Sequence, residues 1–279
     1  MENILEAGKM TLKWSERMQG FDISKDGTKA YIAEDDGLKM LNISNPADPY
    51  QVGGYFYTDG IANNVTVSKD GTKAYIADNS NGVVIIDISD MSEIALIEER
   101  NTEDIALSVD EKTLASVGYI IEGESHLTIF DVSDPAKPTK LGSYKIDDST
   151  FGVELSKDGT KAYLARFGAL LIIDISDPSK PTKIGELEIK DDSFVSVGCI
   201  FGIALSKDET KAYIANSDIG ILVVDISDQA KPTKISEYPD FQYGSSIKLS
   251  SDGTKIYVDG FDDDEWSSII AMFDIDKDN

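Results

Sequence analysis

Short apolar stretches, rich in β-branched and aromatic side chains, alternate with polar turns along the whole chain. One part shows the pattern well: the stretches 201–206, 211–216, 220–227 and 232–238 are separated by turns that contain Asp or Pro. Such stretches are typical of β-strands, and no segment of about twelve or more residues has the period of an amphipathic helix. The pattern therefore predicts an all-β protein.

The same turn, Ser-Lys-Asp-Gly-Thr or a close variant, recurs through the sequence at spacings of 40 to 50 residues. One apolar stretch precedes each turn and further stretches follow it, so that a full repeat contains four predicted strands. A repeat length in this range is typical of propellers and solenoids. The turn begins at Ser24, Ser68, Ser108, Ser156, Ser206 and Ser250, which gives six repeats.

The middle strands of each repeat are almost continuously apolar, as at 169–173 and 219–224, which indicates burial on both faces. A four-stranded sheet that is buried on both faces must lie between two neighbours, and six such sheets can close into a ring. We therefore predict a single domain over residues 1–279 that folds as a six-bladed β-propeller of four-stranded antiparallel blades.

Closure of this ring needs one additional strand. The sixth repeat ends at Asn279 before a fourth strand can form, whereas residues 9–14 form a spare strand ahead of the first repeat. We expect this N-terminal strand to complete the last blade and so to join the two ends of the ring.

Two kinds of aspartate recur with the repeat. Within the turn, the Asp side chain is expected to accept hydrogen bonds from backbone amides, while the Gly adopts a positive φ. A second Asp ends the third strand, for example Asp87 and Asp174. Because the same residue recurs from blade to blade, we expect a structural hydrogen bond there rather than a metal site.

Residues 170–189 (LLIIDISDPSKPTKIGELEI) and 221–238 (ILVVDISDQAKPTKISEY) resemble the LVIVD-repeat family. The resemblance implies a β-propeller, and a place at the cell surface or outside the cell, where proteins with this repeat often occur. It implies no catalytic residues. The N-terminus shows no basic segment followed by an apolar one, so a signal peptide is not visible and a cytosolic protein stays an alternative.

The charge balance excludes some classes of partner. The chain has 26 basic and 51 acidic residues, a net charge of −25. Nucleic acids and anionic membranes attract basic patches, so neither is expected to bind. No apolar run is long enough to cross a bilayer, so membrane insertion is not expected either.

Charge also differs between the two ends of the predicted ring. The end that carries the first-to-second and third-to-fourth strand turns, here named the turn face, collects sixteen lysines, and nearby acids largely balance them. The opposite end, here named the loop face, collects twenty carboxylates, whose summed potential attracts cations. They are Glu34, Asp35, Asp36, Asp59, Asp78, Glu103, Asp104, Glu122, Glu124, Asp147, Asp148, Asp191, Asp192, Asp218, Asp240, Asp259, Asp262, Asp263, Asp264 and Glu265.

The sequence therefore predicts a binding site at the loop face and the mouth of the channel. Carboxylate and amide oxygens suit Ca²⁺, so Asn64, Asp104 and Glu154 are candidate calcium ligands, although no cofactor is required. Exposed aromatic side chains on these loops suit contacts to glycans or peptides. The predicted binding residues are Asp22, which lies deeper, Asn63, Asn64, Asp104, Glu154, Arg166, Phe167, Tyr243 and Trp266.

These observations favour a non-enzymatic binding scaffold, a monomer that takes a protein, a glycan or a cation on its loop face. One histidine, His126, and one cysteine, Cys199, are present, and neither lies in a catalytic or zinc-binding motif. We expect His126 in an exposed loop and Cys199 as a buried thiol. The alternatives are a Ca²⁺-dependent hydrolase of the lactonase or phosphoesterase type with a channel metal, and a structural module that docks through its turn face.

Overall fold

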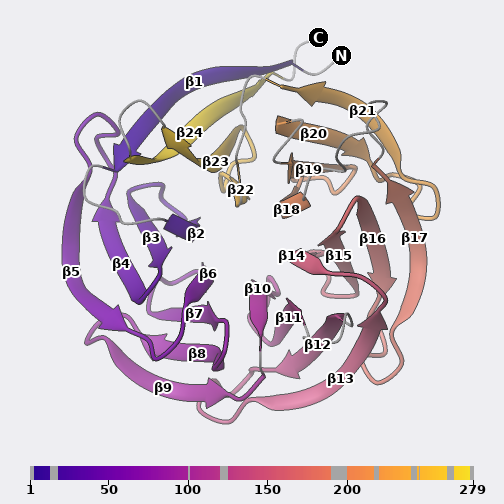
Figure 1. Cartoon of the computed structure of the whole chain (residues 1–279), viewed down its shortest axis with the longest axis horizontal. Coiled ribbons are helices and arrows are strands. Elements are labelled where there is room, and N and C mark those ends of the chain that lie inside the picture. The colour runs from indigo at the N-terminus through magenta and orange to yellow at the C-terminus, as the bar shows by residue number, and fades with distance from the viewer. Residues whose placement is uncertain are drawn as a thin grey trace.

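Six four-stranded antiparallel sheets surround a central axis in the computed structural model of the chain (Figure 1). The structure describes residues 3–12, 18–99, 101–119, 125–189, 200–216, 220–239, 244, 246–262 and 267–276. Every helix or strand element in these ranges is a β-strand. The prediction of a six-bladed all-β propeller is confirmed.

Each blade uses four strands that run from the channel to the outer rim. Blade 1 contains β2 (Met18–Ile23), β3 (Lys29–Glu34), β4 (Gly37–Asn42) and β5 (Tyr50–Tyr57), and blade 2 contains β6 (Ala62–Val67), β7 (Lys73–Asp78), β8 (Gly82–Asp87) and β9 (Ser92–Ile97). Blade 3 contains β10 (Thr102–Leu107), β11 (Thr113–Tyr119), β12 (Ser125–Asp131) and β13 (Thr139–Ile146), and blade 4 contains β14 (Thr150–Leu155), β15 (Lys161–Arg166), β16 (Ala169–Asp174) and β17 (Thr182–Glu188). Blade 5 contains β18 (Ile200–Leu205), β19 (Lys211–Asn216), β20 (Gly220–Asp225) and β21 (Thr233–Tyr238), and blade 6 contains β22 (Ile247–Leu249), β23 (Lys255–Asp262), β24 (Ser267–Asp276) and β1 (Asn3–Leu12).

The N-terminal strand closes the ring, as predicted. β1 pairs antiparallel with β24, from Asn3 opposite Asp276 to Leu12 opposite Ser268. The strand begins earlier than the predicted residues 9–14, because β24 is itself long enough to pair with residues 3–8. Met10 and Leu12 of β1 are buried, so the closing strand also contributes to the core.

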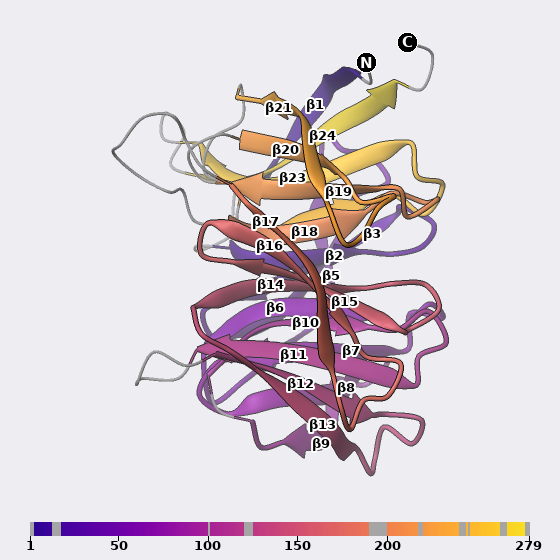
Figure 2. The ribbon, with the colours of Figure 1, turned by 90° about the vertical axis from the view of Figure 1, so that its right-hand side faces the viewer.

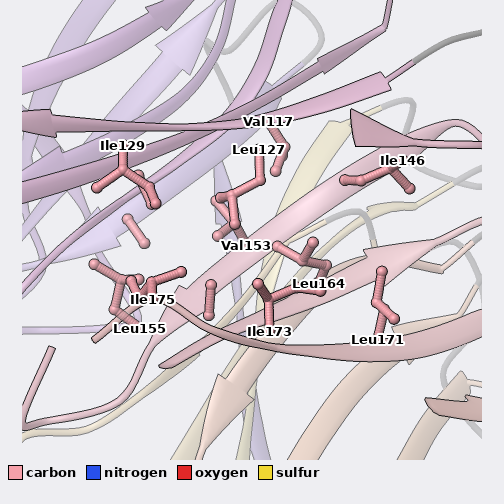
Figure 3. Close-up of a cluster of buried hydrophobic side chains, with 13 residues drawn as sticks. Val117, Leu127, Ile129, Ile146, Val153, Leu155, Leu164, Leu171, Ile173 and Ile175 are labelled. Carbon is pink, nitrogen blue, oxygen red and sulfur yellow. The ribbon is translucent and has the colours of Figure 1, made fainter. Parts of the chain in front are cut away.

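Neighbouring blades bury apolar side chains between their faces. Figure 3 shows the cluster between blades 3 and 4, where Val117 and Ile129 of blade 3 lie near Val153 and Ile173 of blade 4. Among the described residues each of the six interfaces between blades has such a cluster. This arrangement explains why the middle strands are apolar on both sides rather than alternating.

The recurring turn forms as the sequence predicts. In the first repeat Asp26 Oδ1 accepts hydrogen bonds from Thr28 N (3.0 Å) and from Ser24 Oγ (2.6 Å), and Gly27 has a φ of 70°. The hydrogen bonds from Ser24 and Thr28 lower the pKa of Asp26 to about 2. The aspartates of the third strands are structural too: Asp87 Oδ1 accepts a hydrogen bond from Ser89 N at 2.8 Å.

Glutamate replaces the turn glycine in two repeats and joins neighbouring blades. Glu111 and Glu209 stand at the glycine position with φ values of 60° and 57°, which is uncommon for residues other than glycine. Their carboxylates accept hydrogen bonds from the backbone amides of Lys69 and Lys157, each in the preceding blade. The departures from the consensus turn therefore connect blade 2 to blade 3 and blade 4 to blade 5.

The expectation for His126 is wrong. His126 lies within strand β12 opposite Lys145 and is only half-exposed, because the chain continues the blade where the sequence indicated a loop. Cys199 lies outside the described residues.

The connections gather at the two ends of the ring, which is visible from the side (Figure 2). The antiparallel order within blade 1 places the β2–β3 and β4–β5 turns at one end and the β3–β4 turn at the other. The same order holds in the other blades, so the turn face and the loop face are opposite ends of the molecule.

Candidate functional site

Six equivalent residues of the innermost strands form a ring around the channel. Each stands two positions before the Ser of the recurring turn and pairs with the equivalent residue of the second strand, for example Asp22 with Tyr31 and Lys248 with Tyr257. Because the register is the same in every blade, the six residues lie at one level of the channel. We name this set the channel ring; it consists of Asp22, Thr66, Ala106, Glu154, Ala204 and Lys248.

Asp22 joins blade 1 to blade 2 at this level. Its carboxylate accepts hydrogen bonds from Ile23 N at 2.8 Å and from Val67 N at 2.9 Å, and Thr66 contributes a further side-chain hydrogen bond. The charge of Asp22 is thus held in place by backbone amides of two blades. A carboxylate with such partners is held in one orientation on the channel wall.

Asp104 joins blades 2, 3 and 4, and it stands two residues before Ala106 of the channel ring, on the side of the loop face. Its Oδ1 accepts hydrogen bonds from Ile105 N at 2.8 Å and from the side-chain amide of Asn64, and its Oδ2 accepts one from Val153 N at 2.7 Å. Asn64 in turn accepts a hydrogen bond from Val65 N. Two of the predicted binding residues therefore meet, and they hold neighbouring inner strands together.

A cavity of about 340 Å³ lies against the channel ring. It extends toward the turn face, where Val109, Lys157 and Ser251 form part of its wall. The sequence placed a ligand at the opposite, loop-face end of the channel. We name this space the channel cavity; its polar wall includes Asp22, Thr66, Glu154, Lys157, Ser250 and Lys248.

Burial shapes the electrostatics of this wall. It raises the pKa of Glu154 to about 7, against an ordinary value of 4.5; the ammonium of Lys248 and the amide of Leu155 oppose this shift, and the carboxyl groups of Asp104 and Asp22 add to it. Burial also raises the pKa of Asp22 and of Asp104, although the same ammonium and the backbone amides oppose this shift.

Lys248 is the positively charged member of the channel ring, whereas Lys157 and Lys207 line the cavity nearer the turn face. Burial alone would lower its pKa, but the carboxylates of Asp22, Asp104 and Glu154 outweigh that effect and raise the pKa. Within the part of the chain that the structure describes, Lys248 forms no ion pair shorter than 4.0 Å and donates no side-chain hydrogen bond. The charge of its ammonium is therefore balanced by carboxyl groups that lie more than 4.0 Å away, and the side chain lies on the wall of a cavity.

Replacement of Glu154 by Gln is expected to stabilise the protein above pH 7. The pKa of the Glu154 carboxyl rises from 4.5 in the unfolded chain to about 7 in the folded protein, so ionisation is harder in the folded state. At a pH above 4.5 this difference lowers the stability of the folded state. The stability of the wild type relative to Glu154→Gln should fall as the pH rises from about 4.5 to 7, by about 2 kcal/mol once cavity water is allowed for. Urea denaturation of both proteins from pH 4.5 to 8.5 measures this difference, and a difference that does not change with pH would contradict it.

Lys248 and Thr66 were missed by the sequence analysis. Both stand two residues before the turn Ser, at the position of Asp22 and Glu154. Alignment of the six repeats on that Ser would have shown one position that is charged in three blades and small or hydroxylated in the others. The signal was present in the sequence, but that these residues share one level of the channel follows only when the repeats are placed around a common axis.

The other predicted binding residues lie away from this cavity. Asn63 Nδ2 donates to Glu103 Oε2 at 3.0 Å, and Arg166 pairs with Asp148 at 3.4 Å and with Glu186. Phe167 is 43% exposed next to Arg166, at the loop face of blade 4. Tyr243 and Trp266 lie outside the described residues.

The loop face is less uniformly acidic at its surface than the sequence indicated. Glu34, Asp78 and Asp259 are buried; Glu34 pairs with Lys39, and Asp259 accepts a hydrogen bond from Ser246 N. Nine further residues of that set are not among the described ones: Glu122, Glu124, Asp191, Asp192, Asp218, Asp240, Asp263, Asp264 and Glu265. A protein, glycan or basic partner at this face stays a prediction.

The calcium prediction rests on Asn64, Asp104 and Glu154. In the described ranges no group of three or more His, Cys, Asp or Glu side chains is arranged to hold a metal ion. Asp104 already accepts three hydrogen bonds, and the ammonium of Lys248 supplies positive charge to the same carboxylates. The residues thus do not fit a calcium ion well, and calcium stays an untested prediction.

Comparison with known proteins identifies the repeat and the fold. The profile of the LVIVD repeat matches residues 21–56, 59–102, 118–146, 157–188 and 209–240. Among solved structures, hydrazine synthase of Kuenenia stuttgartiensis is similar, with a TM-score of 0.74 and 15% identity over 91% of this chain and 83% of that one. A chain of a mitotic checkpoint complex has a TM-score of 0.66 and 12% identity over 98% of this chain and 93% of that one.

At these identities the solved structures show a shared fold and nothing about activity. No curated protein matches the chain. The described residues contain no helix that is long and apolar enough to cross a membrane.

Proposed function

This chain belongs to the LVIVD-repeat family, and from that premise we propose that it is a non-enzymatic binding module that holds a small polar ligand in the channel cavity. The observation that carries the proposal is Lys248, a charged side chain on the wall of the cavity whose ammonium has no ion pair within 4.0 Å among the described residues. A ligand group is the partner that would complete its hydrogen bonds.

The surroundings of Lys248 support binding. The cavity volume of about 340 Å³ falls at the lower end of the range for small-molecule sites, about 300 to 1,000 Å³. Its wall is built from inner strands of several blades, and Asp22 and Asp104 tie these strands together through backbone amides. Side chains on such a rigid frame are already ordered before a ligand arrives, which lowers the entropic cost of binding.

Binding is favoured over catalysis by the chemistry of the wall. The described lining residues include neither histidine nor cysteine, so the wall offers no nucleophile paired with an imidazole base. Asp22 is engaged by two backbone amides and by Thr66, which hold its carboxyl group in place against the wall rather than free to reach a substrate. The loop face, with its exposed Tyr57 and Phe167, is the surface on which a macromolecular partner would dock.

A ligand screen with lysine labelling tests the proposal. Compounds that raise the melting temperature of the wild type should protect Lys248 from acetylation by acetic anhydride, with modification read by mass spectrometry. Lys183, an exposed lysine of β17, serves as the internal control and should stay reactive. If every stabilising compound leaves Lys248 as reactive as before, the ligand does not occupy the channel cavity and the proposal is wrong.

A further inference from the structure

We infer that the ligand of the channel cavity is a small zwitterion, with a carboxylate that binds Lys248 and an ammonium that lies beside Glu154 and Asp22. This inference rests on the proposed function and specifies its ligand class. It follows from which polar groups of the wall are already satisfied and which still have capacity.

The carboxylates of the site are not equivalent. Asp22 and Asp104 each accept two backbone amides and a further side-chain hydrogen bond, so they contribute charge but little free hydrogen-bonding capacity. Among the described residues Glu154 has one hydrogen-bond donor, Leu155 N at 3.2 Å. Glu154 is therefore the carboxylate that can bind a donor group of a ligand.

Lys248 has the complementary capacity. An ammonium can donate three hydrogen bonds, and that of Lys248 donates none to the described side chains and backbone. A carboxylate in the cavity would accept these hydrogen bonds and form a short ion pair, which is stronger than a neutral hydrogen bond. The wall thus offers a donor site for an anionic group and an acceptor site for a cationic group.

Ligands with a single charge fit less well. An anion that binds Lys248 also meets the carboxyl groups of Asp22 and Asp104, and a cation that binds Glu154 meets the ammonium of Lys248. Such like-charge contacts oppose binding, because charges on the wall of a protein cavity interact more strongly than charges in bulk water. A sugar is not favoured either, because the described lining residues include no aromatic ring on which it could stack.

Three sets of probes with matched carbon chains separate these cases. The first set is the ω-amino acids from glycine to 5-aminopentanoate, which vary the distance between the two charges. The second is the alkylamines and the third the alkylcarboxylates of the same lengths. We expect one ω-amino acid to bind at least about tenfold more tightly than its matched amine and carboxylate in isothermal titration calorimetry.

The site residues give two further readouts. Lys248→Met and Glu154→Gln should each weaken that ω-amino acid by about tenfold or more, whereas the surface variant Lys183→Met should leave it unchanged. Because an ammonium next to Glu154 favours its carboxylate, binding below pH 7 should release a proton, which titrations in two buffers of different ionisation enthalpy detect. The glutamine variant should release none.

The outcomes separate a failure of the zwitterion inference from a failure of the proposed binding function. If an amine or a carboxylate alone binds as tightly as the matched amino acid, or if no ω-amino acid binds while another compound protects Lys248 from acetylation, the zwitterion inference is wrong and the binding function stands. If no compound of the screen protects Lys248, the proposed function fails together with the inference. If the Lys248→Met variant does not fold, the test is whether the ω-amino acid protects Lys248 of the wild type from acetylation.

Discussion

Deletion of residues 1–12 is expected to lower the melting temperature by more than about 15 °C, or to prevent folding. The deletion removes β1, so nine residues of β24 lose their paired partners and become an open sheet edge. It also removes the buried side chains of Ile4, Met10 and Leu12. At about 1.5 to 3 kcal/mol for each buried side chain, the loss is comparable to the whole stability of a typical domain, about 5 to 15 kcal/mol.

A peptide of residues 1–14 added in trans tests the cause. It should restore much of the melting temperature, because it can pair with β24 and fill the same space. A peptide in which Met10 and Leu12 are replaced by Ser is the matched control and should not restore it. A truncated protein that melts within about 3 °C of the wild type would show that β1 does not close the ring.

The fold could be predicted because its main signals are local. The hydrogen bonds of the turn at Ser24 and Asp26 join residues that are no more than five positions apart, so the residue types alone indicate the turn. Six such turns at similar spacing, with apolar strands between them, then determine the number of blades. The closing strand followed from counting the strands, although its start at Asn3 depends on the length of β24, which no local signal indicated.

The candidate site could be predicted only in part, because it depends on contacts between blades. Asp22, Asn64, Asp104 and Glu154 were named as residues expected near the channel, and the structure brings Asn64 and Asp104 into contact. Lys248 was missed because its relation to Asp22 and Glu154 appears only when three distant repeats share one level of the channel.

The charges of the loop face show a second limit. The sequence cannot distinguish a solvated aspartate from one that accepts a backbone amide inside the protein. Asp259 was counted as surface charge, yet it is buried and accepts a hydrogen bond from Ser246 N. Asp78 is also buried, with Asn81 Nδ2 at 2.9 Å from its Oδ2. Each lies at or near the end of a second strand, where Asp259 accepts from a backbone amide and Asp78 from an asparagine side chain.

Replacement of Lys248 by Met is expected to have the second large effect, a loss of about 2 to 3 kcal/mol in the free energy of unfolding at pH 8. Three carboxyl groups that lie on or beside the cavity wall, those of Asp22, Asp104 and Glu154, would then lose the positive charge of Lys248. Removal of one member of a buried charged group leaves the others uncompensated, and water in the cavity reduces that cost without abolishing it. The exposed Lys183→Met variant should lose less than about 0.5 kcal/mol.

The pH dependence of this loss identifies its origin. At pH 5, below the pKa of about 7 of Glu154, that carboxyl takes up a proton and no longer adds negative charge, so the loss should be smaller than at pH 8. The double variant Lys248→Met with Glu154→Gln should recover about 1 kcal/mol or more of the loss at pH 8, because one uncompensated charge has been removed. Urea denaturation of the four proteins at both pH values measures all of these differences. A loss that is equal at pH 5 and pH 8, and that the second substitution does not reduce, would mean that Lys248 stabilises the ring through the packing of its methylene chain rather than through its charge.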